Sequence, residues 1–259
     1  MKSITLLLPL ILAIGSSASA STLLFQDNFN DPDGSLTTPT AGRVSGLAAG
    51  QTALESFRSV QSISNNQLAL NGNGGVRFGP ENDRYDWAGP TTGGAILAAG
   101  GFSVSFDWTY AGSSTDWLAF KIGGPNADSN VNPGDLDFSI LLRENGGNQL
   151  FDNGANLGDT GLSFAAVPNV TVPVVVNYMF DSFADGSNVN VTASVDGVEV
   201  VNNNFTWDGN NGELYFELQA ETDFSIDNLA IATIPEPSVA SLGLLGGLFL
   251  LRRKRRSVA

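Results

Sequence analysis

The sequence predicts an all-β fold, a two-sheet antiparallel β-sandwich. Between residues 21 and 233, short segments alternate apolar and polar residues with a period of two, as half-buried strands do. Clusters of Gly, Asn, Asp, Ser and Pro separate these segments, and no stretch sustains a helical period. A long series of strands with turn-rich connections is typical of a sandwich rather than of a helical or α/β fold.

The first twenty residues have the three parts of a secretory signal peptide. Lys2 provides a positive charge, residues 4–14 form a short apolar core, and Ala18-Ser19-Ala20 offers small side chains for cleavage. We expect cleavage after Ala20. The rest of the chain is expected to comprise one β-sandwich domain over residues 21–233 and a C-terminal tail over residues 234–259.

The clearest strand covers residues 101–110, GFSVSFDWTY, in which every second residue is apolar. Residues 188–201, NVNVTASVDGVEVV, alternate on both sides of Asp196-Gly197, a dipeptide typical of a tight hairpin turn. Comparable patterns predict further strands at residues 23–29, 67–72, 116–123, 137–143, 170–180, 213–219 and 224–232.

The strand that runs into VDGVEV at residues 195–200 resembles the strand-hairpin of concanavalin A-like and laminin-G-like jelly rolls. The opening segment LLFQDNF and the closing segment FSIDNLAIA extend the resemblance, because in those folds the first strand pairs near the last. The resemblance implies a jelly-roll sandwich with one concave sheet that often faces carbohydrate.

The predicted domain is strongly acidic. Residues 21–234 contain 25 of the 26 acidic residues, all but Glu236, against six basic residues. Such a body repels phosphates, so nucleic acid is not expected as a partner, whereas divalent cations suit it as counterions. The chain has no cysteine and no histidine. Disulfides, Ser-His-Asp and Cys-His catalysis, and zinc sites with thiolate or imidazole ligands are therefore excluded.

The tail combines Pro235-Glu236-Pro237, an apolar run over residues 239–251, and a basic cluster. A helix of 13 residues rises about 20 Å, which is short of the roughly 30 Å hydrocarbon core. The run would therefore span a bilayer only marginally, with the basic cluster on the cytoplasmic side. That cluster consists of Arg252, Arg253, Lys254, Arg255 and Arg256.

The order of these three elements at the chain end resembles the PEP-CTERM sorting signal of Gram-negative bacteria. The resemblance implies that an exosortase-type enzyme recognises Pro235-Glu236-Pro237 and removes the hydrophobic tail. It also implies a membrane-anchored precursor that associates transiently with the inner membrane, and a mature protein at the cell surface or in the exopolysaccharide matrix of a biofilm. The alternative is an ordinary single-pass anchor.

Residues 27–34, DNFNDPDG, form an oxygen-rich loop of the kind that suits calcium. We expect Asp27, Asp31 and Asp33 as candidate ligands, joined by Asp227 if a structural calcium ties the first strand to the last. The alternative is a set of Asx-turns with solvated carboxylates.

Two tryptophans, Trp87 and Trp207, lie in polar, glycine-rich surroundings and are the candidates for stacking against sugar rings. The alternative is that each packs back onto its own sandwich. Trp108 and Tyr110 share the apolar phase of residues 101–110 and are expected in the core.

No catalytic residue can be assigned. Residues 81–86, ENDRYD, superficially resemble the E-x-D-x-x-E strand of laminarinase-like glycosidases, but the last position is aspartate and the intervening residues suit a surface loop. We therefore expect an adhesive or carbohydrate-binding protein without catalysis, with exopolysaccharide as its partner. A secreted jelly-roll glycoside hydrolase or polysaccharide lyase and a purely structural matrix protein remain the alternatives.

Overall fold

Residues Ser21–Ile234 form one compact unit. The structure, a computed structural model, describes residues 21–36, 43–45, 52–80, 85–110, 116–124, 136–143, 147–152, 155–159, 167–208, 212–221 and 224–234. The predicted signal peptide, the sorting motif, the apolar run and the basic cluster lie outside the described residues. Among the described residues, no helix is long and apolar enough to cross a membrane.

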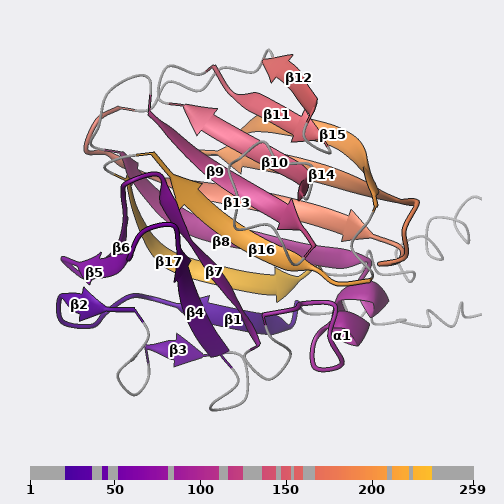
Figure 1. Ribbon diagram of the computed structural model, residues 1–259, viewed down its shortest axis with the longest axis horizontal. Helices are drawn as coiled ribbons and strands as arrows, with labels where there is room; N and C mark the ends of the chain where they lie inside the picture. The colour runs from indigo at the N-terminus through magenta and orange to yellow at the C-terminus, as the bar shows by residue number, and fades with distance from the viewer. Residues whose placement is uncertain are drawn as a thin grey trace, which may run out of the picture. The chain divides into compact units, whose positions relative to one another are not determined.

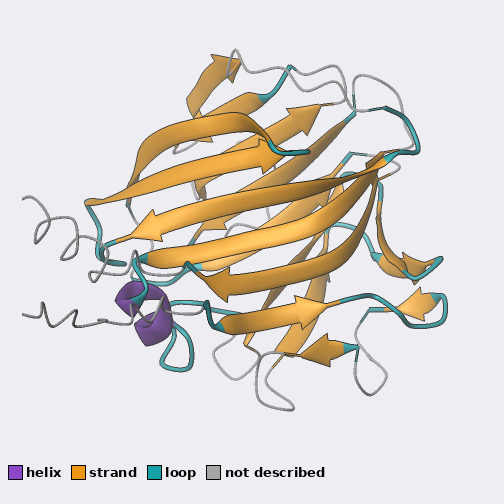
Figure 2. Ribbon diagram, turned by 180° about the vertical axis from the view of Figure 1, so that it is seen from behind, coloured by secondary structure: helices purple, strands orange, loops and turns teal. Residues whose placement is uncertain are grey.

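Ten of the described strands form one antiparallel sheet, which faces the reader in Figure 2. Eight of them follow one another across the sheet, while β1 pairs with β17 and β3 pairs with β1. In that order the strands are β15 (Val198–Trp207), β14 (Ser187–Val195), β13 (Thr171–Phe180), β8 (Gly101–Tyr110), β17 (Phe224–Thr233), β6 (Gln67–Leu70), β5 (Ser62–Ser64) and β2 (Gly34–Ser35), with β1 (Leu23–Asp27) and β3 (Val44–Ser45) off this path.

The other seven described strands form a second antiparallel sheet, in front in Figure 1. Across this sheet the order is β12 (Ala155–Asp159), β11 (Gln149–Asp152), β10 (Leu136–Arg143), β9 (Trp117–Gly123), β16 (Tyr215–Ala220), β7 (Gly74–Pro80) and β4 (Thr52–Phe57). A six-residue helix, α1 (Gly93–Ala98), precedes β8. The predicted all-β, two-sheet sandwich is confirmed.

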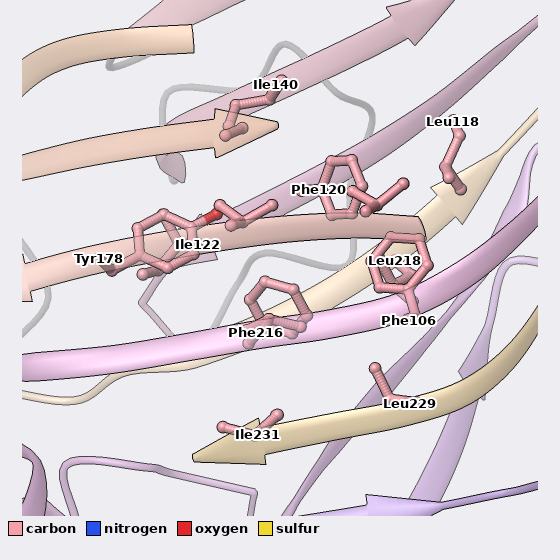
Figure 3. Close-up of a cluster of buried hydrophobic side chains, with 14 of the residues drawn as sticks. Phe106, Leu118, Phe120, Ile122, Ile140, Tyr178, Phe216, Leu218, Leu229 and Ile231 are labelled. Atoms are coloured by element: carbon pink, nitrogen blue, oxygen red, sulfur yellow. The ribbon is translucent and has the colours of Figure 1, made fainter. Parts of the chain in front are cut away.

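The hydrophobic core lies between the two sheets and is rich in aromatic rings (Figure 3). Phe106 of β8 packs on Phe120 of β9 with ring centroids 5.1 Å apart, and Phe138 of β10 stacks on Phe205 of β15 at 4.7 Å. Strand alternation explains this arrangement, because every second side chain of a strand points to the same face. In β8 the expected core residues Trp108 and Tyr110 are both buried.

The two ends of the compact unit are joined. β1 pairs with β17, and the Thr22 amide donates to Oγ1 of Thr233 at 2.8 Å while the Thr233 amide donates to the Thr22 carbonyl at 2.9 Å. The expected pairing of the first strand with the last is therefore present.

Candidate functional site

The acidic loop that follows β1 is organised by an arginine. Arg43 places Nε 3.1 Å from Oδ1 of Asp27 and Nη1 2.8 Å from Oδ2 of Asp31, while its Nη2 donates to the Leu36 carbonyl at 2.9 Å. All three charged side chains are buried. Burial raises the pKa of Asp27 to about 6, although the Phe29 amide and the Arg43 guanidinium act in the opposite direction.

The four predicted calcium ligands do not converge. Asp33 is exposed and accepts a hydrogen bond from the Asn65 amide at 2.8 Å, which fixes the turn between β5 and β6. Asp227 lies opposite Asp107 of β8, whereas Asp27 lies opposite Leu229. Among the described residues, no group of three acidic side chains is placed to hold a metal ion. The guanidinium of Arg43 provides the positive charge between Asp27 and Asp31.

Trp87 and Trp207, the candidates for stacking against sugar rings, both pack back onto the sandwich, which was the alternative. Their exposed fractions are 1% and 0%. The Trp87 indole donates to the Phe78 carbonyl at 2.8 Å and meets the ring of Phe25 edge-on at 6.3 Å. Trp207 meets the ring of Phe180 edge-on at 5.2 Å. Neither ring is available for stacking on a sugar, because both fill the core.

The segment with the superficial glycosidase resemblance is only partly described, since residues 81–84 lie outside the described residues. Asp86 is described. Its Oδ1 accepts hydrogen bonds from the amides of Ala88 and Leu214, both at 2.8 Å. Asp86 therefore holds the chain against the start of β16, which is a structural role.

The outer face of the seven-stranded sheet carries a set of ion pairs that the sequence did not indicate. Glu217 of β16 lies opposite Arg77 of β7 on one side and Lys121 of β9 on the other. Its Oε1 accepts from Nε and Nη2 of Arg77 at 2.8 and 2.7 Å, and its Oε2 lies 2.8 Å from Nζ of Lys121. We call these three residues the ionic row.

The ionic row is covered. The side chains of Lys121 and Glu217 have no exposed area, and that of Arg77 is 12% exposed. Burial lowers the pKa of Lys121, and Glu217 opposes the change. The ring of Tyr215, 5.0 Å from the Arg77 guanidinium carbon, closes one side. Gly79 of β7 lies against the backbone of Tyr85, because a Cβ added at Gly79 would come within 2.6 Å of the Tyr85 carbonyl oxygen.

The outer face of the ten-stranded sheet is open and lined by short polar side chains. We call this surface, which extends over β15, β14, β13, β8 and β17 (Figure 2), the polar face. Its hydroxyl and amide residues are partly or fully exposed. They are Ser103, Ser105, Thr109, Thr171, Asn177, Asn188, Asn190, Thr192, Ser194, Asn202, Asn204, Thr206 and Ser225.

Hydrogen bonds between neighbouring strands orient these side chains. Oγ1 of Thr109 and Oγ1 of Thr171 are 2.7 Å apart, and Nδ2 of Asn190 donates to Oδ1 of Asn204 at 3.1 Å. Strands lie about 4.8 Å apart, and residues on one face of a strand repeat every 6.6 Å or so. The polar face is thus an array of donors and acceptors, which is interrupted by outward apolar residues of β13 and β17. These are Pro173, Val175, Met179, Ala230 and Ala232.

The polar face carries little charge. Among the described residues of its five strands, only Asp107, Glu199 and Asp227 place a charged side chain on it. Asp107 and Asp227 lie opposite each other, and burial together with the Asp107 charge raises the pKa of Asp227. In a domain with 25 acidic residues, such a face suits a neutral, hydroxyl-rich ligand better than a charged one.

No protein-family model matches the sequence, and no curated protein matches it. Among solved structures, the Emp46p carbohydrate-recognition domain aligns with a TM-score of 0.43, 12% identity, and coverage of 70% of this chain and 87% of that domain. The alginate lyase Aly36B aligns with a TM-score of 0.42, 13% identity, and coverage of 68% and 84%.

A sialidase of Trypanosoma rangeli aligns with a TM-score of 0.50 and 13% identity over 84% of this chain and 32% of the sialidase. At these identities the likeness concerns the fold alone. The chain is a two-sheet antiparallel β-sandwich.

Proposed function

We propose that this protein is an exported bacterial surface or matrix protein that binds neutral polysaccharide through the polar face and does not catalyse its cleavage. The observation that supports the proposal is the polar face itself, which carries few charges and presents many exposed or half-buried hydroxyl and amide groups. Such groups exchange hydrogen bonds readily with sugar hydroxyls. Aromatic stacking plays no part, because Trp87 and Trp207 are in the core.

The test is binding of the mature protein, residues 21–234, to exopolysaccharides and simple β-glucans. Replacing Asn177 and Thr192, which are hydrogen-bonded across β13 and β14, with alanine is expected to reduce affinity. The matched control is Ser64→Ala with Gln67→Ala on β5 and β6, outside the polar face. Equal loss in both variants, or undiminished binding in the first, would contradict the proposal.

The ionic row favours a second candidate, a glycoside hydrolase or polysaccharide lyase. In backbone register, Glu55 of β4 follows Arg77 and Glu217 along the same row, so the two glutamates lie two strands, about 10 Å, apart. Glycoside hydrolysis uses two carboxyl groups about 5 to 9.5 Å apart, and the backbone spacing of these two positions lies near the upper end of that range. Release of reducing or unsaturated sugar ends that disappears with Glu217→Gln would support the enzyme. If the protein neither binds a polysaccharide nor releases a product, the remaining alternative is a structural matrix protein without a specific ligand.

We further propose that delivery follows the PEP-CTERM route. The proposal rests on the N-terminal signal sequence and on the order of Pro235-Glu236-Pro237, apolar run and basic cluster. An exosortase-type enzyme would be the processing partner, and the inner membrane a transient one. Intact-mass analysis of the natural extracellular protein tests this, because residues beyond Ser238 on mature material would exclude removal of the tail.

A further inference from the structure

We propose that β15, the edge strand of the ten-stranded sheet, pairs antiparallel with β15 of a second copy of this chain. The partner is therefore the protein itself, and the product is one continuous sheet across two copies. This inference does not rest on saccharide binding, since it concerns the backbone edge of β15, although Asn202 and Asn204 of this strand also belong to the polar face.

The first argument is the position and length of β15. The strand closes one end of the strand order, has ten residues, and pairs with β14 along its inner side. Strand edges in natural proteins are usually protected by short length, lysine, proline, inward charge or a β-bulge. The bulge of β15 lies at Val200, near its start, and residues 201–207 pair with β14 in regular register. In β15 there is no lysine or proline, and Glu199 is its one charged residue.

The second argument is self-complementarity. A two-fold axis through Asn203 places Asn202 opposite Asn204 of the second copy and Val201 opposite its Phe205. Asn202 and Asn204 are exposed, so this register would extend the asparagine pair that Asn190 already forms with Asn204. Val201 and Phe205 are buried, so they would meet on the core side. The ten-stranded sheets of the two copies would therefore join with polar side next to polar side and core side next to core side.

The third argument is electrostatic. The mature domain has 19 more acidic than basic residues, since residues 21–234 hold 25 of the former and six of the latter. Two copies therefore repel each other at most approaches. In the proposed register the central pairs contain no charge. The nearest charge on β15 is Glu199, whose Oε1 accepts a hydrogen bond from Nδ2 of Asn202 at 3.5 Å. In this register Glu199 lies opposite Trp207 of the second copy and not opposite another charge.

The experiment measures the oligomeric state of the mature protein by analytical ultracentrifugation at low and high salt. We expect a monomer–dimer equilibrium that salt shifts toward the dimer, because salt screens the repulsion. Asn202→Asp with Asn204→Asp places two pairs of like charges opposite each other and is expected to raise the dimer Kd roughly tenfold or more. The control, Asn188→Asp with Ser194→Asp on β14, adds equal charge away from the edge.

Mixing provides the decisive result. The double aspartate variant and the corresponding variant with Asn202→Lys and Asn204→Lys should each be mainly monomeric, and together they should form a heterodimer. Circular dichroism of each variant separates loss of pairing from loss of folding. The proposal would be overturned if the natural protein were monomeric under all conditions, or if the control dissociated as much as the aspartate variant. It would also be overturned if two folded variants formed no heterodimer.

Discussion

The carboxylate of Asp27 is held in the interior by one arginine and one backbone amide. Arg43 bridges it to Asp31, and the Phe29 amide donates to its Oδ1 at 2.8 Å. Even so, desolvation dominates and the pKa of Asp27 rises to about 6. The ionised form of this carboxyl is therefore less favourable in the folded protein than in the unfolded chain.

The first prediction concerns pH. Well below pH 3.8, the ordinary pKa of an aspartate, Asp27 is protonated in both states. Between this pH and about 6 the unfolded chain releases the proton first, so the Asp27 contribution to the free energy of unfolding falls as pH rises. One pKa unit corresponds to about 1.4 kcal/mol, so the total decline is about 3 kcal/mol. Urea unfolding of the natural protein and Asp27→Asn at pH 4, 5, 6 and 7 measures it. A constant difference between the two proteins would contradict the prediction.

The second prediction concerns the ionic row. Lys121→Met removes one of the two ion-pair partners of the buried Glu217 carboxylate and leaves Arg77, and removing one partner of a buried ion pair costs about 3–5 kcal/mol. Combining Lys121→Met with Glu217→Gln should cost less than the sum of the two single changes. Guanidinium unfolding provides the measurement. As a control, Arg143→Met on β10 removes a partly exposed cation and should cost about 1 kcal/mol or less.

At the level of strands, β17 contains a β-bulge between Asp227 and Ala230, where its register with β8 shifts. Ile226 and Leu229 are both buried, so Asp227 and Asn228 between them are both directed outward. Asn228 has φ of 51°, and its amide donates to Oδ1 of Asp227 at 2.7 Å. The bulge thereby turns two consecutive polar side chains onto the polar face.

The third prediction follows from the pairing beside this bulge. Asp107 and Asp227 are like charges directly opposite each other, a contact that destabilises antiparallel strands. Asp227→Asn should therefore raise stability at pH 7 by about 0.2–1 kcal/mol, and the gain should shrink at high salt. Glu199→Gln is the control, because Glu199 lies opposite Ser194. Thermal unfolding in low and high salt tests both, and a loss of stability in Asp227→Asn would refute the argument.

Strands with a strong period-two pattern could be predicted from sequence, whereas strands with mixed composition could not. Residues 101–110 and 188–201 are strands as expected. β7, GGVRFGP, was missed because glycine and proline dominate it and its outward residue is Arg77. Short β11 and β12 were missed as well. The polar neighbours of Trp207 left its burial open, although its two-residue spacing from the apolar Phe205 indicates the core phase.

The candidate sites depend on contacts that span long stretches of sequence. Arg43 reaches Asp27 and Asp31 from a segment with no clear pattern, so the acidic loop alone suggested calcium. The ionic row gathers residues 77, 121 and 217 from three strands. Strand register determines which residues become neighbours across a sheet, and register cannot be read from any single segment of the sequence.

At the scale of the whole molecule, the acidic domain raises the question of cations. The fourth prediction is that EDTA leaves the Tm of the mature protein unchanged, because Arg43 already compensates Asp27 and Asp31. Differential scanning calorimetry with EDTA or with added calcium measures this. A Tm that falls by several degrees on chelation would contradict the prediction and support a calcium site in the acidic loop. Asp31→Asn should then abolish the effect of calcium.

The place of β17 in the sheet also bears on when the domain can form. This strand lies between β8 and β6 and pairs with β1 as well, yet it is the last described strand of the chain. A chain emerging from a translocation pore amino end first would present every other described strand before the one that joins them. For an exported chain, the sandwich then cannot close until Thr233 has crossed the membrane. Translocation would therefore be complete before the domain is folded.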